Sequence, residues 1–117
     1  MSSLETITYD INGKIFSAEL TPLNGSGSSL KSVISLEGNK VFSVKFSIAP
    51  DLMEKWNMDL KAAEKFLLAF AKPYSKVRTY RNNLSGQEDY PFDMDFASVK
   101  PESLVEKITN EWNTISG

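Results

Sequence analysis

Hydrophobic and polar residues alternate along residues 4–21, as in β-strands that bury one face. Asn12-Gly13 divides this segment, and the dipeptide favours the tight turn of a β-hairpin because both residues tolerate a positive φ. Placing the turn there fixes the pairs across the hairpin, which are Ile11 with Lys14, Tyr9 with Phe16, and Ile7 with Ala18. The pattern therefore predicts a hairpin with one apolar face.

Residues 30–48 predict a second hairpin, which turns at Gly38-Asn39. The Gly- and Ser-rich segment 22–29 between the hairpins is interpreted as a mobile loop. In the second hairpin this turn divides the apolar residues between two faces, with Leu30, Ile34, Leu36 and Val41 on one and Val33, Phe42, Val44, Phe46 and Ile48 on the other. Two apolar faces indicate an inner position in the sheet or an interface with another chain.

The period changes to that of an α-helix over residues 50–72. A break is expected near residues 57–59, with Asp59 as the N-cap of the second part, and Pro73 is expected to end the helix. The apolar stripe of this helix consists of Ala63, Phe66, Leu67 and Phe70.

The remaining sequence predicts two short strands and a final helix. Residues 76–81 and 90–96 are the strands, separated by a polar loop over 82–89. Residues 101–115 form the amphipathic helix, which needs a sheet to pack on, with an apolar stripe of Leu104, Val105, Ile108, Trp112 and Ile115. The expected fold is one α+β domain over residues 1–117, in which an antiparallel sheet packs against the central and C-terminal helices.

The amino-acid composition excludes several kinds of catalytic and metal-binding site. The chain of 117 residues contains no Cys and no His, so disulfides, thiolate nucleophiles, cysteine-ligated zinc and histidine acid–base pairs are all excluded. We therefore expect a non-catalytic protein with no cofactor and no metal. The formal net charge of -2 disfavours a strong nonspecific nucleic-acid binder. Residues 1–5 do not resemble a secretory signal and no apolar stretch is long enough to span a membrane, so a cytoplasmic protein is expected.

Charge is most uneven between residues 72 and 95. The basic half supplies the candidate anion or nucleic-acid contacts, which are Lys72, Lys76, Arg78 and Arg81, with Tyr74 and Tyr80 available to stack on bases. The acidic half follows with Glu88, Asp89, Asp93 and Asp95. A structural interpretation is favoured over the nucleic-acid one, with the two halves facing each other across neighbouring strands.

The acidic half is interpreted as a solvated loop. Its spacing does not match a calcium-binding loop. Asp93 and Asp95 would share one face of a strand, but a lone Asp-x-Asp pair gives little reason to expect catalysis.

Three functions are compatible with these observations. The leading hypothesis is an accessory protein that acts through protein–protein contact, in its simplest form a homodimer formed through the second hairpin. The second is an anion or nucleic-acid binder that uses residues 72–81. The third is a small-molecule binder or enzyme with a pocket between the sheet and the helices. No membrane contact is expected.

Overall fold

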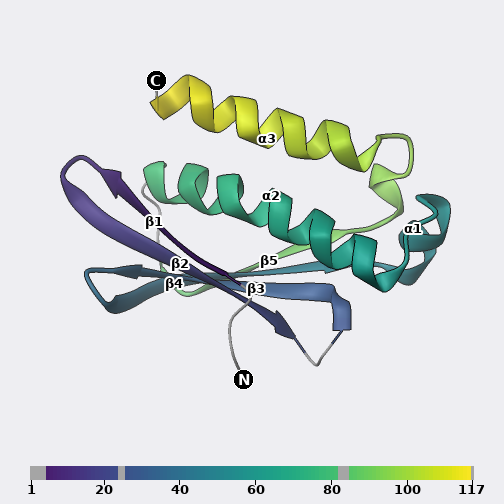
Figure 1. Ribbon diagram of the computed structural model, residues 1–117, viewed down its shortest axis with the longest axis horizontal. Helices are drawn as coiled ribbons and strands as arrows, with labels where there is room; N and C mark the ends of the chain where they lie inside the picture. The colour runs from purple at the N-terminus through teal and green to yellow at the C-terminus, as the bar shows by residue number, and fades with distance from the viewer. Residues whose placement is uncertain (1–4, 24–25, 82–84, 117) are drawn as a thin grey trace.

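Five β-strands form one sheet, and two long helices lie on one side of it (Figure 1). The computed structural model describes residues 5–23, 26–81 and 85–116. In chain order the elements are β1 (Glu5–Ile11), β2 (Lys14–Leu23), β3 (Ser26–Leu36), β4 (Asn39–Ile48), α1 (Pro50–Lys55), α2 (Leu60–Tyr80), β5 (Gln87–Phe92), the 3-10 helix η1 (Met94–Phe96) and α3 (Pro101–Ser116). The predicted α+β class is confirmed.

The first hairpin has the predicted turn and register. Asn12 and Gly13 have positive φ angles of 55° and 83°. Tyr9 faces Phe16 and Ile7 faces Ala18 in the antiparallel pairing of β1 with β2. The agreement follows because turn chemistry and hydrophobic alternation specify the same register here.

The segment between the hairpins contains more strand than predicted. β2 extends to Leu23 and β3 begins at Ser26, so the expected loop over 22–29 is wrong over most of its length. Residues 24 and 25 lie outside the described ranges. Serine on a strand can face solvent while its backbone pairs with the neighbouring strand, which composition alone does not reveal.

The second hairpin turns one residue earlier than predicted. β3 ends at Leu36 and β4 begins at Asn39, so the turn residues are Glu37 and Gly38, with φ angles of 50° and 88°. A β-bulge next to Ile34 shifts the register further along the hairpin. A slip of one residue exchanges the two faces of a strand, so the predicted division of apolar residues between faces is wrong.

Most apolar residues of the second hairpin instead gather on one face, with Val33 on the other. Ile34 faces Phe42 and Leu30 faces Phe46, and all four are buried. The opposite face carries polar side chains such as Lys45, which is exposed. β3 and β4 do hold the predicted inner positions in the sheet. The hairpin nevertheless lacks a second apolar face, which removes the reason for expecting a homodimer interface there.

The central helical region has the predicted break and cap. The Asp59 carboxylate accepts a hydrogen bond of 2.8 Å from the backbone N–H of Ala62, which begins α2. The predicted apolar stripe of α2, Ala63, Phe66, Leu67 and Phe70, is buried.

Pro73 lies inside α2 and does not end it, so the predicted helix end at residue 72 and the strand over 76–81 are both wrong. The last two turns of α2 bury Ser75, Val77 and Thr79. Their packing offsets the roughly 3 kcal/mol by which an interior proline disfavours a helix. Pro73 also leaves the carbonyl of Ala69 without its helical partner, and Ala69 is exposed, so water can hydrate that group.

The predicted strand over 90–96 is displaced towards the N-terminus. β5 spans Gln87–Phe92 and runs parallel to β4, which α2 connects to it. Gln87, Glu88 and Asp89 therefore belong to a strand instead of the predicted loop, and residues 82–84 of that loop lie outside the described ranges. Asp93 accepts a hydrogen bond of 3.0 Å from the N–H of Asp95 and caps η1. The expected placement of Asp93 and Asp95 on one strand face is wrong.

α3 begins at Pro101 as predicted and has the predicted amphipathic pattern, with Ile108 buried. It packs on α2 and not on the sheet as expected, so α2 lies between the sheet and α3 (Figure 1). The two helices run in the same direction, because each starts at the end of the molecule where α1 lies (Figure 1). Within the described ranges, no helix combines the length and apolar composition needed to cross a membrane.

Candidate functional site

The predicted anion-binding residues lie on the C-terminal half of α2, with Arg81 as its C-cap. A helix distributes these side chains around its axis, so the segment does not form one basic row. Tyr74, Arg78 and Arg81 line one hollow in the surface, whereas Lys72, Lys76 and Tyr80 do not line it.

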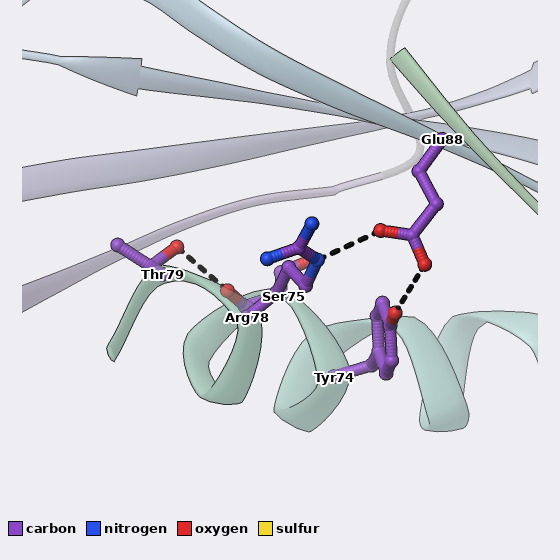
Figure 2. Close-up of polar contacts among 5 residues, drawn as sticks. All are labelled: Tyr74, Ser75, Arg78, Thr79 and Glu88. Atoms are coloured by element: carbon purple, nitrogen blue, oxygen red, sulfur yellow. Dashed lines mark hydrogen bonds and ion pairs between the residues drawn. The ribbon is translucent and has the colours of Figure 1, made fainter. Parts of the chain in front are cut away.

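Glu88 of β5 joins two of these residues to the sheet (Figure 2). One carboxylate oxygen accepts a hydrogen bond of 2.7 Å from Nε of Arg78, and the other accepts one of 2.7 Å from the hydroxyl of Tyr74. The Arg78 side chain is 22% exposed and that of Glu88 is 30% exposed, so the ion pair is partly shielded from water. Of the predicted contacts between the basic and acidic halves, the described part of the chain shows one ion pair, Arg78 with Glu88. The predicted pairing of two strands is wrong, because residues 72–80 belong to a helix.

Two phenols beside Glu88, those of Tyr74 and Tyr90, have raised pKa values. Burial raises the pKa of Tyr74, and its hydrogen bond to the Glu88 carboxylate raises it further. Burial also raises the pKa of Tyr90, followed by the negative charge of Glu88. Tyr74 therefore acts as a hydrogen-bond donor at neutral pH and is unsuited to acting as a base.

The other basic residues also contact groups of the same chain. Lys72 forms an ion pair of 2.8 Å with Glu5 on β1, and Arg81 forms an exposed one with Glu111 on α3. The Lys76 ammonium lies 5.8 Å from the centre of the Trp112 ring. The ring of Tyr80 packs edge-on against Trp112, with 6.4 Å between the centroids.

A buried polar row fixes the end of α2 to the sheet. The hydroxyl of Thr79 donates to the backbone carbonyl of Ser75 at 2.7 Å (Figure 2). Its single proton is thereby used, so the Tyr9 hydroxyl, 2.8 Å away, must be the donor in their shared hydrogen bond. Ser75 and Ser32 share another hydrogen bond of 2.8 Å. Burial raises the pKa of Tyr9 to about 12.

The hollow beside Arg78 has a volume of about 700 Å³. Its lining is formed by Phe42, Tyr74, Arg78, Arg81, Ser85, Gln87 and Glu88. The guanidinium carbon of Arg78 lies 4.8 Å from the centre of the Phe42 ring, so a cation–π contact holds one face of the group. Among the described residues, no three carboxylates come together as a metal site would require.

A second concave site lies between the first halves of α2 and α3, and it is mostly apolar. This groove has a volume of about 460 Å³ and is lined by Trp56, Asn57, Met58, Ala62, Lys65, Phe66, Ala69, Pro101, Glu102 and Val105. The indole N–H of Trp56 donates to the carbonyl of Val99 at 2.8 Å, and its ring packs edge-on against Phe66. These two contacts hold the Trp56 ring in place at the end of the groove.

Three of the five large hydrophobic residues that are exposed in the described ranges lie at or before the starts of α2 and α3, and none of the five lines the groove. Leu60 at the start of α2 is 55% exposed, Met94 of η1 is 45% exposed and Val99 before α3 is 36% exposed. The groove was not predicted from the sequence, because it depends on the placement of α3 beside α2. The feature of the sequence that could have indicated the groove is the pair Ala62 and Ala69, which are small residues on the exposed side of a helix.

Comparison of the chain with protein family models, curated proteins and solved structures finds no match.

Proposed function

We propose that this protein is a non-catalytic, cytoplasmic accessory protein that binds an amphipathic helix of another protein in the groove between α2 and α3. The observation that carries the proposal is the mostly apolar lining of that groove, in which Ala62 and Ala69 are exposed and Trp56, Met58, Pro101 and Val105 are half-buried. The absence of Cys agrees with a reducing compartment. The absence of His and Cys favours binding over catalysis.

The shape of the groove suits a helix as its occupant. Ala62 and Ala69 lie two turns apart on α2, about 10 Å along its axis. Both are exposed and small, so another backbone can approach closely there. Phe66 lies between them, and Val105 forms the facing wall on α3. An incoming helix would place apolar residues at intervals of three and four along this surface, as in other helix-in-groove complexes.

Charge at the two sides of the groove favours one orientation of that helix. Lys65 lines the groove from α2, and Glu102 lines it from α3. Both residues are exposed. A complementary helix has acidic residues along the side that meets Lys65 and basic residues along the side that meets Glu102.

Nucleic-acid binding is the less favoured alternative. Lys72 and Lys76 already contact Glu5 and Trp112 within the chain. A nucleic-acid strand would have to replace those contacts while gaining phosphate contacts from a helix whose basic residues point in several directions.

Photo-crosslinking from within the groove tests the proposal. A photoreactive phenylalanine derivative is placed at Met58, a large residue that lines the groove, in the full chain, and cells that make this protein are irradiated. The matched control carries the same group at Thr8, an exposed residue of β1. We expect one discrete adduct from position 58, with a mass different from twice the 13.1 kDa chain, and none from position 8.

Two further results discriminate the occupant. Lys65→Glu in the Met58 derivative should strongly reduce the adduct, because it reverses the charge on one side of the groove. An adduct of two copies of this chain would identify a homodimer and contradict the proposed partner. Failure of the folded derivative to form any adduct would contradict a protein-binding groove.

A further inference from the structure

The Arg78 guanidinium is held in one orientation by two contacts of different kinds. Nε donates to Glu88, and the face of the group lies over the Phe42 ring. The contact with Glu88 is made by Nε, and neither terminal nitrogen takes part in it (Figure 2). An arginine fixed in this way loses little side-chain entropy when its terminal N–H groups bind an oxyanion.

We propose that the hollow beside Arg78 binds a small phosphate monoester, with the terminal N–H groups of Arg78 and Arg81 as the principal phosphate ligands. This inference does not rest on the proposed function, because the hollow and the apolar groove have no lining residue in common.

Arg81 can turn towards the phosphate at little expense. Its side chain is 59% exposed, and its ion pair with Glu111 lies at the surface, where such pairs contribute little to stability. Arg81 follows Arg78 by three residues, so both side chains emerge on one side of the last turn of α2. Ser85 and Gln87 also line the hollow and supply hydroxyl and amide groups for the remaining phosphate oxygens.

Glu88 is compatible with an anion in this hollow. Its two carboxylate oxygens accept hydrogen bonds from Arg78 and Tyr74, which reduces the negative charge that a ligand would meet. The second arginine, Arg81, then supplies the positive charge that compensates the phosphate.

The hollow is wide enough for an organic phosphate of low molecular weight. Its volume of about 700 Å³ exceeds the needs of a bare phosphate and lies within the range of small-molecule sites. Lys72 and Lys76 do not line it. The basic residues that bind the phosphate are therefore confined to one end of α2, whereas a nucleic-acid strand requires a longer row of contacts.

Titration with inorganic phosphate at constant ionic strength tests this site, with NMR detection of backbone amides and arginine Nε–H groups. We expect shifts of the Arg78 and Arg81 Nε–H signals and of the Gln87 amide. Loss of a charged hydrogen bond lowers affinity by about tenfold or more, and this loss is expected for Arg81→Ala. Lys76→Ala is the matched control on the same helix and should change affinity by less than about twofold.

A second variant protects the test against misfolding. Arg78→Lys retains a positive charge for Glu88 but removes the planar fork, and it should also weaken phosphate binding by about tenfold. Equal weakening by Lys76→Ala and Arg81→Ala would show diffuse attraction and overturn the site, as would the absence of shifts well above millimolar phosphate. A single-stranded oligonucleotide whose binding depends on Lys72 and Lys76 instead would also overturn it.

Discussion

Replacement of Tyr9 by Phe should change how the stability of the protein depends on alkaline pH. Tyr9 is 8% exposed, and its hydroxyl donates to Thr79 at 2.8 Å. Burial raises its pKa from the ordinary value of 10.0 to about 12. Below pH 10 both the folded and the unfolded chain keep this proton. Between pH 10 and 12 only the unfolded chain releases it, so the free energy of unfolding falls as pH rises.

The magnitude follows from the pKa difference. Each unit of pKa corresponds to about 1.4 kcal/mol, so a rise of Tyr9 from 10.0 to about 12 lowers stability by about 3 kcal/mol once both states are ionised. At pH 11 the loss is about 1.4 kcal/mol. Tyr9→Phe removes this loss but also removes one buried hydrogen bond, which lowers stability by about 1 kcal/mol at pH 8. The two stability curves should therefore meet near pH 11.

Urea unfolding from pH 8 to pH 11.5, followed by circular dichroism, measures both curves. Thr79→Val is the control, because it removes the partner of Tyr9 and leaves the phenol in place. That variant should be less stable at pH 8 and keep the alkaline loss of the wild type. A constant difference between wild type and Tyr9→Phe across this pH range would refute the burial of a protonated Tyr9.

Two further predictions concern the contact between β5 and α2 and the register of the second hairpin. Glu88→Gln should lower the free energy of urea unfolding by about 2 kcal/mol, because Arg78 loses its charged partner, whereas Asp89→Asn on the same strand should change it by less than about 0.5 kcal/mol. Ile34→Ala should lower the free energy of unfolding, measured by thermal denaturation, by about 3 kcal/mol, and Val33→Ala should lower it by about 1 kcal/mol or less. A larger loss for Val33→Ala than for Ile34→Ala would contradict the observed register.

The parts of the fold that could be predicted are those in which clear local signals in the sequence specify the structure. Asn12-Gly13 and the alternation around it agree on one register, and the carboxylate at Asp59 marks the start of α2. The turn of the second hairpin was predicted wrongly because Gly38 can occupy either position of a tight turn. A bulge next to Ile34 also changes the register of this hairpin. A bulge has no reliable signature in a single sequence.

The candidate sites were less predictable, because they depend on contacts between distant elements. Pro73 was interpreted as a helix end, although tertiary packing of Ser75 and Thr79 carries α2 past it. The opposite charges of residues 72–81 and Glu88 were recognised in the sequence. Their placement on a helix and on a strand was not predicted. The apolar groove was missed because α3 was expected on the sheet and lies on α2.

The helix-binding groove is tested most directly by hydrogen–deuterium exchange, measured on the protein alone and on its complex with the partner that crosslinking identifies. This complex is purified from proteins that have not been crosslinked. We predict slower exchange at residues 56–69 and 101–105, with little change at residues 72–81 or in β1. Slowing confined to residues 72–81 or to the strands would contradict the groove as the binding surface.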